Sequence, residues 1–239
     1  MIVSRRTMLQ GSALLGTASM FPLRAWADDH GTHVTPAEAL AKLTEGNRKF
    51  VAGEAPPVLD KAHLASLAGG QEPFATIVSC SDSRVPPELI FEVGPGDLFV
   101  VRNAGNTAST VQSMGSIEYS VFKLKVPLIL VLGHSKCGAV DAATAIVQSN
   151  ATFPGSIGPM VEPILPAALA VRGHPGVPLD NGIVENVIRV RDRLRSPEQP
   201  ILYPALRSGA LMIVGAVYDI ESRRVVFLPE TAAATPAAH

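Results

Sequence analysis

Four unbroken apolar runs dominate the pattern of hydrophobic and polar positions along the chain. Their Val, Ile and Leu residues are not interrupted by the polar positions that a half-exposed strand would show. Such runs are typical of strands in a parallel sheet that is covered on both faces. We therefore expect strands at 74–79, 98–102, 127–133 and 210–218, and a last edge strand at 225–228 after a turn.

Segments with helical periodicity alternate with these runs. Thr35-Pro36-Ala37-Glu38 has the form of a capping box with proline at the first helical position, which predicts a helix over 36–51. A short helix at 61–68, a helix within 107–123 and a helix through 184–194, beginning after Asp180-Asn181-Gly182, are also expected. Strands that alternate with helices predict an α/β fold with a mostly parallel central sheet flanked by helices.

The first 27 residues have the pattern of an export signal. Arg5 and Arg6 precede an apolar run that extends to Leu23, and Ala25-Trp26-Ala27 offers a cleavage site. The paired arginines resemble a twin-arginine signal, with Met8 where that pattern usually has Phe; an ordinary secretory signal is the alternative. We expect a periplasmic or otherwise exported protein whose single domain covers 28–239, with a core at about 36–229 and a loose tail at 230–239.

Composition and charge narrow the function classes. The chain has 239 residues, of which 47% are hydrophobic and 17% charged, as in one globular domain. Its net charge of −1 becomes −4 when Arg5, Arg6 and Arg24 leave with the signal, which contains no acidic residue. No basic patch indicates nucleic acid as a partner, and no segment of the mature chain is expected to span a membrane.

The chain has two cysteines, Cys80 and Cys137, and each follows one of the apolar runs. In an oxidising periplasm a disulfide between them is the default interpretation. It would leave Asp82 and His134 unexplained, although both follow the same strand ends, where ligands of parallel sheets bind. Two thiolates, an imidazole and a carboxylate form a donor set that suits zinc.

Arg84 distinguishes two kinds of zinc site. A closed structural site favours four Cys or His ligands, whereas Asp82 is a weaker ligand. A guanidinium can bind both oxygens of Asp82 and hold that carboxylate away from the metal, which leaves one coordination position for water. The residues alone therefore permit either a structural or a catalytic zinc site.

The segment from Cys80 to Pro86, CSDSRVP, together with GHSKCG at Gly133–Gly138, resembles the signature pair of the β-class carbonic anhydrases. The resemblance extends from about Ala37 to Leu228 through ALAKLTEGNRKFV, DLFVVRNAGN, GSIEYSV and IVGAVYDIE. It implies one Zn²⁺ per chain, held by Cys80, His134 and Cys137. Asp82 would be either the fourth ligand or the partner of Arg84. Ile77 stands where bicarbonate-regulated members have Trp, so we expect the open form, in which Asp82 pairs with Arg84.

The resemblance also implies a substrate pocket. Gln71 matches a substrate-side glutamine, and Gly138 lies in the second motif. Phe99 and Tyr119 match aromatics that line the pocket, commonly from the neighbouring subunit, although core packing is an alternative role for both. The family further implies a homodimer or homotetramer in which the helix at 36–51 packs on the partner.

The expected activity is the reversible hydration of carbon dioxide to bicarbonate and a proton by a zinc-bound hydroxide. Asp82 would orient the hydroxide and Arg84 would keep Asp82 ionised, while Gln71 would contact the substrate. Two alternatives use the same site: a non-catalytic periplasmic zinc-binding protein, and an enzyme similar to the carbon disulfide hydrolases.

Overall fold

The computed structural model describes residues 34–54 and 61–229. The expected export signal and the tail at 230–239 lie outside the described residues. The strands are β1 (Ala75–Ser79), β2 (Leu98–Arg102), β3 (Leu128–His134), β4 (Met212–Tyr218) and β5 (Val225–Phe227). They form one sheet in the order β2-β1-β3-β4-β5, in which the first four strands are parallel and β5 is antiparallel. The predicted strands and the mostly parallel sheet are therefore confirmed.

Helices surround this sheet. Those N-terminal to β3 are α1 (Pro36–Ala52), α2 (Lys61–Leu67), α3 (Pro87–Ile90), the 3-10 helix η1 (Ala104–Asn106) and α4 (Val111–Phe122). Those that follow β3 are α5 (Gly138–Ser149), α6 (Ile157–Val161), η2 (Glu162–Ile164), α7 (Leu165–Ala170), α8 (Pro178–Leu194) and α9 (Leu202–Arg207). Within residues 34–54 and 61–229, no helix combines the length and apolarity that a membrane span needs.

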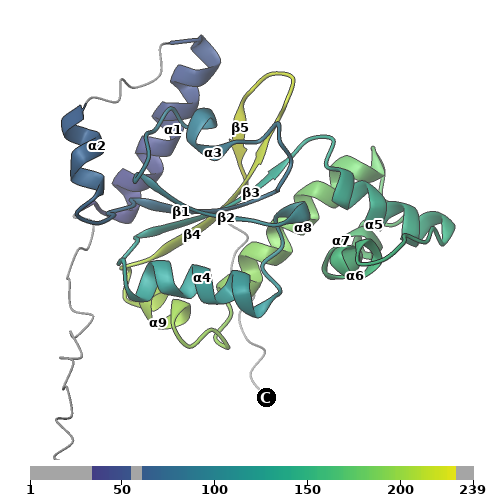
Figure 1. Ribbon diagram of the computed structural model, residues 1–239. Coiled ribbons are helices and arrows are strands. Elements are labelled where there is room, and N and C mark those ends of the chain that lie inside the picture. Colours follow the sequence, from purple (N-terminus) through teal and green to yellow (C-terminus); the bar gives the residue numbers. More distant parts are fainter. Residues whose placement is uncertain (1–33, 55–60, 230–239) are drawn as a thin grey trace, which may run out of the picture.

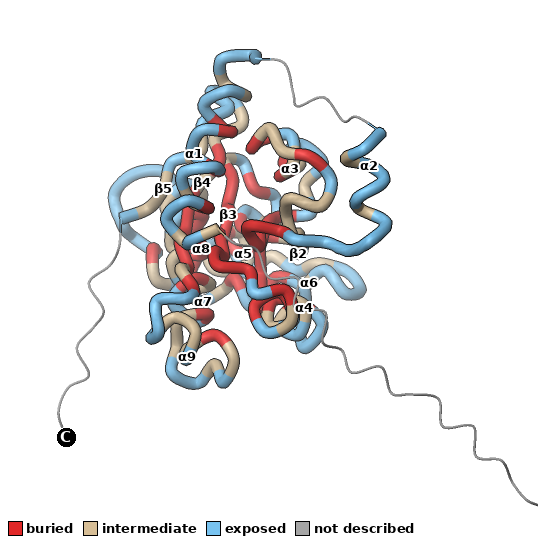
Figure 2. The backbone as a smooth tube through the Cα atoms, turned by 90° about the vertical axis from the view of Figure 1, so that its left-hand side faces the viewer, coloured by how far each residue is buried: buried red, intermediate tan, exposed pale blue. Residues whose placement is uncertain are grey.

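The sheet is the middle of three layers (Figure 1). On one face, α1 and α3 pack against alternate residues of β3 such as Leu128 and Leu130. On the other face, α4, α8 and α9 pack against Ile129 and Val131. All residues of β1 and β3 are buried, and Figure 2 shows this buried centre in red inside exposed outer helices. Two covered faces explain why apolar residues predominate on both sides of these strands.

Helix α1 begins as predicted. The Thr35 hydroxyl accepts a hydrogen bond from the Glu38 amide at 3.3 Å, and the Glu38 carboxylate accepts one from the Thr35 amide at 2.8 Å. The contact with Thr35 lowers the pKa of Glu38. Further along, a Cβ on Gly46 would lie 1.8 Å from the Phe91 carbonyl oxygen, so only glycine permits this close approach of α1.

One helix prediction needs correction. Helix α8 begins at Pro178, so Asp180-Asn181-Gly182 lies inside the helix, because proline at the first turn is itself a start signal. Its buried face contains Asn186 and Arg191, whereas Val184 is exposed. Helix α4 lies within the predicted range 107–123, and its first residue, Val111, is exposed.

Candidate metal centre

Three side chains converge at the carboxyl edge of the sheet. Cys80 follows β1 directly, His134 is the last residue of β3, and Cys137 is the N-cap residue of α5. Because β1 and β3 are parallel neighbours, their ends meet at one edge. The two sulfur atoms and one His134 ring nitrogen all lie within 4.8 Å of one another, and the three residues are at most 5% exposed.

The His134 ring is oriented by its own backbone neighbour. Nδ1 lies 2.9 Å from the Ser135 carbonyl oxygen, which can only accept a hydrogen bond, so Nδ1 carries the proton. Nε2 is then an unprotonated donor to a metal, and it is buried without a hydrogen-bond partner. A buried polar atom without a partner is costly in a native protein, and a bound cation would satisfy it.

The two cysteines are free thiols, so the disulfide interpretation is not supported. The hydrogen bond from Cys137 lowers the pKa of Cys80, and the same bond raises the pKa of Cys137, as burial does. Burial and the adjacent Cys80 sulfur therefore favour the protonated form of Cys137. A metal that binds both sulfurs would release that proton.

Asp82 pairs with Arg84 through both carboxylate oxygens. Arg84 Nε donates to Oδ1 at 2.9 Å and Nη2 donates to Oδ2 at 2.7 Å. This contact is the main cause of the strongly lowered pKa of Asp82. Oδ2 also lies 4.0 Å from His134 Nε2, so the carboxylate borders the three-ligand cluster without belonging to it. The pairing that the open form requires is therefore present.

Backbone contacts hold this loop in place. Arg84 Nη2 donates to the Lys136 carbonyl oxygen at 3.2 Å, which links the loop after β1 to the loop after β3. Arg102, on β2, donates to the carbonyl oxygens of Cys80 at 2.9 Å and Asp82 at 2.6 Å. Two arginines therefore fix the position of the carboxylate beside the cluster.

These residues fit zinc. One ion at about 2.3 Å from each sulfur and about 2.0 Å from a ring nitrogen is compatible with ligand atoms within 4.8 Å of one another. Two sulfurs and one imidazole are the donors that zinc prefers. A tetrahedral ion would retain one position that none of these three residues occupies.

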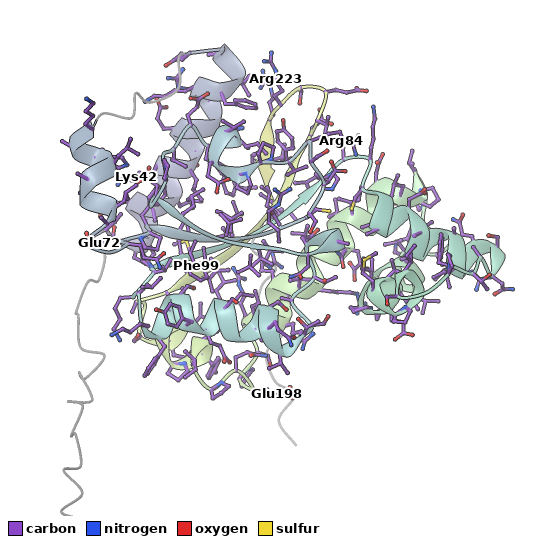
Figure 3. The ribbon with its side chains drawn as sticks, in the orientation of Figure 1. Lys42, Glu72, Arg84, Phe99, Glu198 and Arg223 are labelled. Carbon is purple, nitrogen blue, oxygen red and sulfur yellow. The ribbon has the colours of Figure 1, made fainter. Side chains whose placement is uncertain are left out.

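The structure does not bring the other predicted pocket residues to this cluster within one chain. Phe99 pairs with Thr76 in the sheet, four residues before Cys80, which corresponds to about 13 Å along the strand. Gln71 precedes β1, and its neighbour Glu72 lies at the opposite end of the sheet from Arg84 (Figure 3).

Phe99 and Tyr119 contact each other instead, with ring centroids 6.2 Å apart. Gly138 does lie at the cluster, directly after Cys137. A Cβ at Gly138 would meet no atom within 4 Å, so the space beside Cys137 is open.

Sequence reasoning missed two residues that contact this region, Gly105 and Asn186. The Gly105 amide donates to Cys80 Sγ, and the Asn186 side chain donates to the Gly105 carbonyl oxygen. Both lie far from the two motifs in the sequence. The one available signal was a polar residue at a helix position that the apolar period assigns to the core.

Comparison with known proteins identifies the family. A family model described as "Carbonic anhydrase" matches residues 75–225, which include all three clustered ligands. A protein named carbonic anhydrase 2 from Mycobacterium tuberculosis is 38% identical over 195 residues, which cover 81% of this chain and 93% of that protein. The chain belongs to the β-carbonic anhydrase family. A carbonic anhydrase from Synechococcus elongatus is 32% identical and covers 80% of this chain and 72% of its own length.

Solved β-carbonic anhydrases share the fold. A tetrameric enzyme from Sordaria macrospora superposes with a TM-score of 0.64 at 28% identity and covers 72% of this chain and 89% of its own. A Coccomyxa β-carbonic anhydrase in complex with acetazolamide gives a TM-score of 0.62 at 29% identity, with coverages of 79% and 86%. β-Carbonic anhydrases are zinc lyases that hydrate carbon dioxide, and the Cys80, His134 and Cys137 cluster provides this β-carbonic anhydrase with a site for one zinc ion.

Proposed function

We propose that Asp82 and Arg84 serve carbon dioxide hydration at the Cys80, His134 and Cys137 centre. This proposal rests on the position of the Asp82 carboxylate. Its Oδ2 lies 4.0 Å from His134 Nε2, the nitrogen that faces the metal site, and Arg84 donates hydrogen bonds to both of its oxygens. Bound zinc supplies acidity, since it lowers the pKa of a water molecule from 15.7 to about 7.

Asp82 acts as a fixed hydrogen-bond acceptor beside the cluster. Its lowered pKa keeps the carboxylate ionised throughout the neutral range, so it cannot donate a proton there. Arg84 also prevents the carboxylate from rotating toward His134, because such a rotation would break two charge-assisted hydrogen bonds. The pair thus holds the carboxylate as an acceptor with one fixed orientation. A hydrogen-bond donor that enters the open space next to Gly138 would have to orient toward it.

The variant Asp82→Asn tests this role, because it keeps the shape of the side chain and replaces one acceptor oxygen with a donor. We expect zinc content to stay near one per chain while hydration slows by on the order of 10²-fold. Glu88→Gln, which removes a negative charge from the nearby helix α3, is the matched control and should hydrate at the wild-type rate. Wild-type hydration by zinc-loaded Asp82→Asn would refute the role.

We also propose that the active unit is an oligomer whose pocket is shared between subunits. Within one chain, Gln71 and Phe99 lie far along the sheet from the metal ligands. Helix α4 carries exposed apolar side chains close to that end, with Phe122 65% and Tyr119 39% exposed. A second subunit that covers this apolar surface would bring its Gln71 and Phe99 to a neighbouring metal centre.

A subunit-mixing experiment tests the shared pocket. Cys137→Ser removes a metal ligand and Gln71→Ala removes a substrate contact, so each homo-oligomer should be inactive or strongly impaired. When the two variants are unfolded and refolded together, half of the dimers are mixed and one of their two sites is intact, which predicts roughly a quarter of wild-type activity. No recovery in mixtures shown by mass spectrometry to contain both subunits would contradict a shared pocket.

Export by the twin-arginine route is the third proposal. It is supported by Arg5 and Arg6 ahead of the apolar run and by the Ala25-Trp26-Ala27 site. This route carries folded proteins, so zinc can bind the two thiolates before they reach an oxidising compartment. Changing both arginines to lysine should retain the protein in the cytoplasm. Unchanged periplasmic recovery would contradict this route.

A further inference from the structure

A backbone amide contacts one of the zinc-binding sulfurs. The Gly105 N–H donates to Cys80 Sγ at 3.3 Å, and both residues are buried. A hydrogen bond to a thiolate stabilises its negative charge and reduces the charge that the sulfur gives to a bound metal. The orientation of Gly105 therefore affects the electronic properties of the metal centre.

Gly105 has a conformation that other residues rarely adopt. Its φ of 67° and ψ of 28° lie in the left-handed region. A Cβ at this position would lie 2.4 Å from Ile164 Cδ1 and 3.3 Å from Ala139 Cβ. Glycine is thus required here, but glycine is also the residue with the fewest restrictions on backbone rotation. A second contact is needed to keep its N–H directed at Cys80.

Asn186 supplies that contact. Its Nδ2 donates to the Gly105 carbonyl oxygen at 2.8 Å, from helix α8 on the far side of the loop. The side chain is 1% exposed and occupies a core-facing helix position between Ile183 and Val187. A buried amide is unfavourable unless it is hydrogen-bonded, so this position is better suited to an apolar residue unless the contact with Gly105 is needed.

We propose that Asn186 is a positioning residue for the metal centre. By binding the carbonyl oxygen of Gly105, it limits rotation of that residue and keeps the amide directed at Cys80 Sγ. The hydrogen bond lowers the electron donation of Cys80 to a metal, and the fixed placement of the Cys80 sulfur strengthens the retention of metal by more than this loss. This inference rests on the proposed zinc centre, whose three ligands it leaves unchanged.

The test uses the full chain loaded with cobalt(II), which reports thiolate ligation through a charge-transfer absorption band. Asn186→Leu has a similar volume and no donor, and Asn186→Ala is the second variant should the leucine protein fail to fold. Loss of the N–H contact raises the energy of the sulfur lone pairs, so we expect the band to move to longer wavelength. Zinc affinity, measured by competition with a chelator, should fall about 10-fold or more.

Leu194→Ala is the control for general destabilisation. Leu194 is fully buried two helical turns further along α8, away from the loop at Gly105. Its variant should lower thermal stability but leave the cobalt band and the zinc affinity at wild-type values.

The outcomes separate this inference from the proposed zinc centre. A wild-type band that is unchanged in both Asn186 variants would overturn the positioning role, as would an equal shift in Leu194→Ala. Absence of a thiolate band in the wild type would instead refute the metal centre itself.

Discussion

Removal of the metal should lower the stability of the whole domain. The three ligands lie at the end of β1, at the end of β3 and at the start of α5, so one ion crosslinks three segments that are distant in sequence. Without it, His134 Nε2 is a buried atom with no hydrogen-bond partner. Leaving such a group unsatisfied destabilises the folded state by about 1–3 kcal/mol. This is the minimum by which a bound metal should stabilise the fold.

The upper limit of the stabilisation by metal follows from the linkage between zinc binding and folding. Free zinc at a thousand times its dissociation constant stabilises the folded state by about 4 kcal/mol if the unfolded chain does not bind it. For a domain of this size, 1 kcal/mol shifts the melting temperature by roughly 2–4 °C. Together these values predict that chelation lowers the melting temperature by about 2–16 °C.

Thermal unfolding followed by circular dichroism checks this value. The zinc-loaded chain is compared with the same protein treated with dipicolinate, and Cys137→Ser serves as the control because it lacks one ligand. The variant should lose most of the response to the chelator. A wild-type melting temperature that does not change with chelation, or a response that is equally large in Cys137→Ser, would refute the reasoning.

Two further predictions concern the fold. Gly46→Ala should destabilise by roughly 1–3 kcal/mol in urea unfolding, because its Cβ would clash with the Phe91 carbonyl; Gly115→Ala, whose Cβ meets no atom within 4 Å, should be neutral or stabilising by up to about 1 kcal/mol. Asp219 has a lowered pKa because Ser222 donates hydrogen bonds to it. Asp219→Asn should therefore lower the urea midpoint at neutral pH. The difference should begin to shrink below about pH 4, where the unfolded carboxylate takes up its proton, and should vanish once the pH falls below the lower pKa of the native carboxylate. Equal stability of the two glycine variants, or a difference at Asp219 that persists in acid, would contradict these arguments.

The strands were predictable because burial on both faces leaves a continuous apolar run, and each run coincides with a strand to within two residues. Helix α8 was predicted less well. Its buried face includes Asn186 and Arg191, and these polar residues hide the apolar period. Each has a specific partner, since Asn186 binds Gly105 and Arg191 binds the Pro229 carbonyl oxygen. Local periodicity shows at most a polar residue at a core position and cannot identify its distant partner.

The metal ligands were predictable for a different reason. Cys80 and His134 directly follow or end strands that are parallel neighbours, so strand topology alone brings them together. The distance of Phe99 and Gln71 from the cluster within one chain could not be inferred from spacing, because it depends on the register of β1 and β2. The contact between Gly105 and Cys80 could not be predicted from the sequence either, because it depends on a left-handed turn beside a helix that is distant in the sequence.

Stopped-flow measurement of carbon dioxide hydration tests whether the zinc centre is catalytic. The zinc-loaded full chain is assayed at about pH 7 and at about pH 8.5, then after dipicolinate treatment and after zinc is restored. We expect rapid proton release that is faster at the higher pH, lost on chelation and recovered with zinc. Protein that contains one zinc per chain in the Cys80, His134 and Cys137 site and yet does not hydrate carbon dioxide at either pH would contradict this expectation.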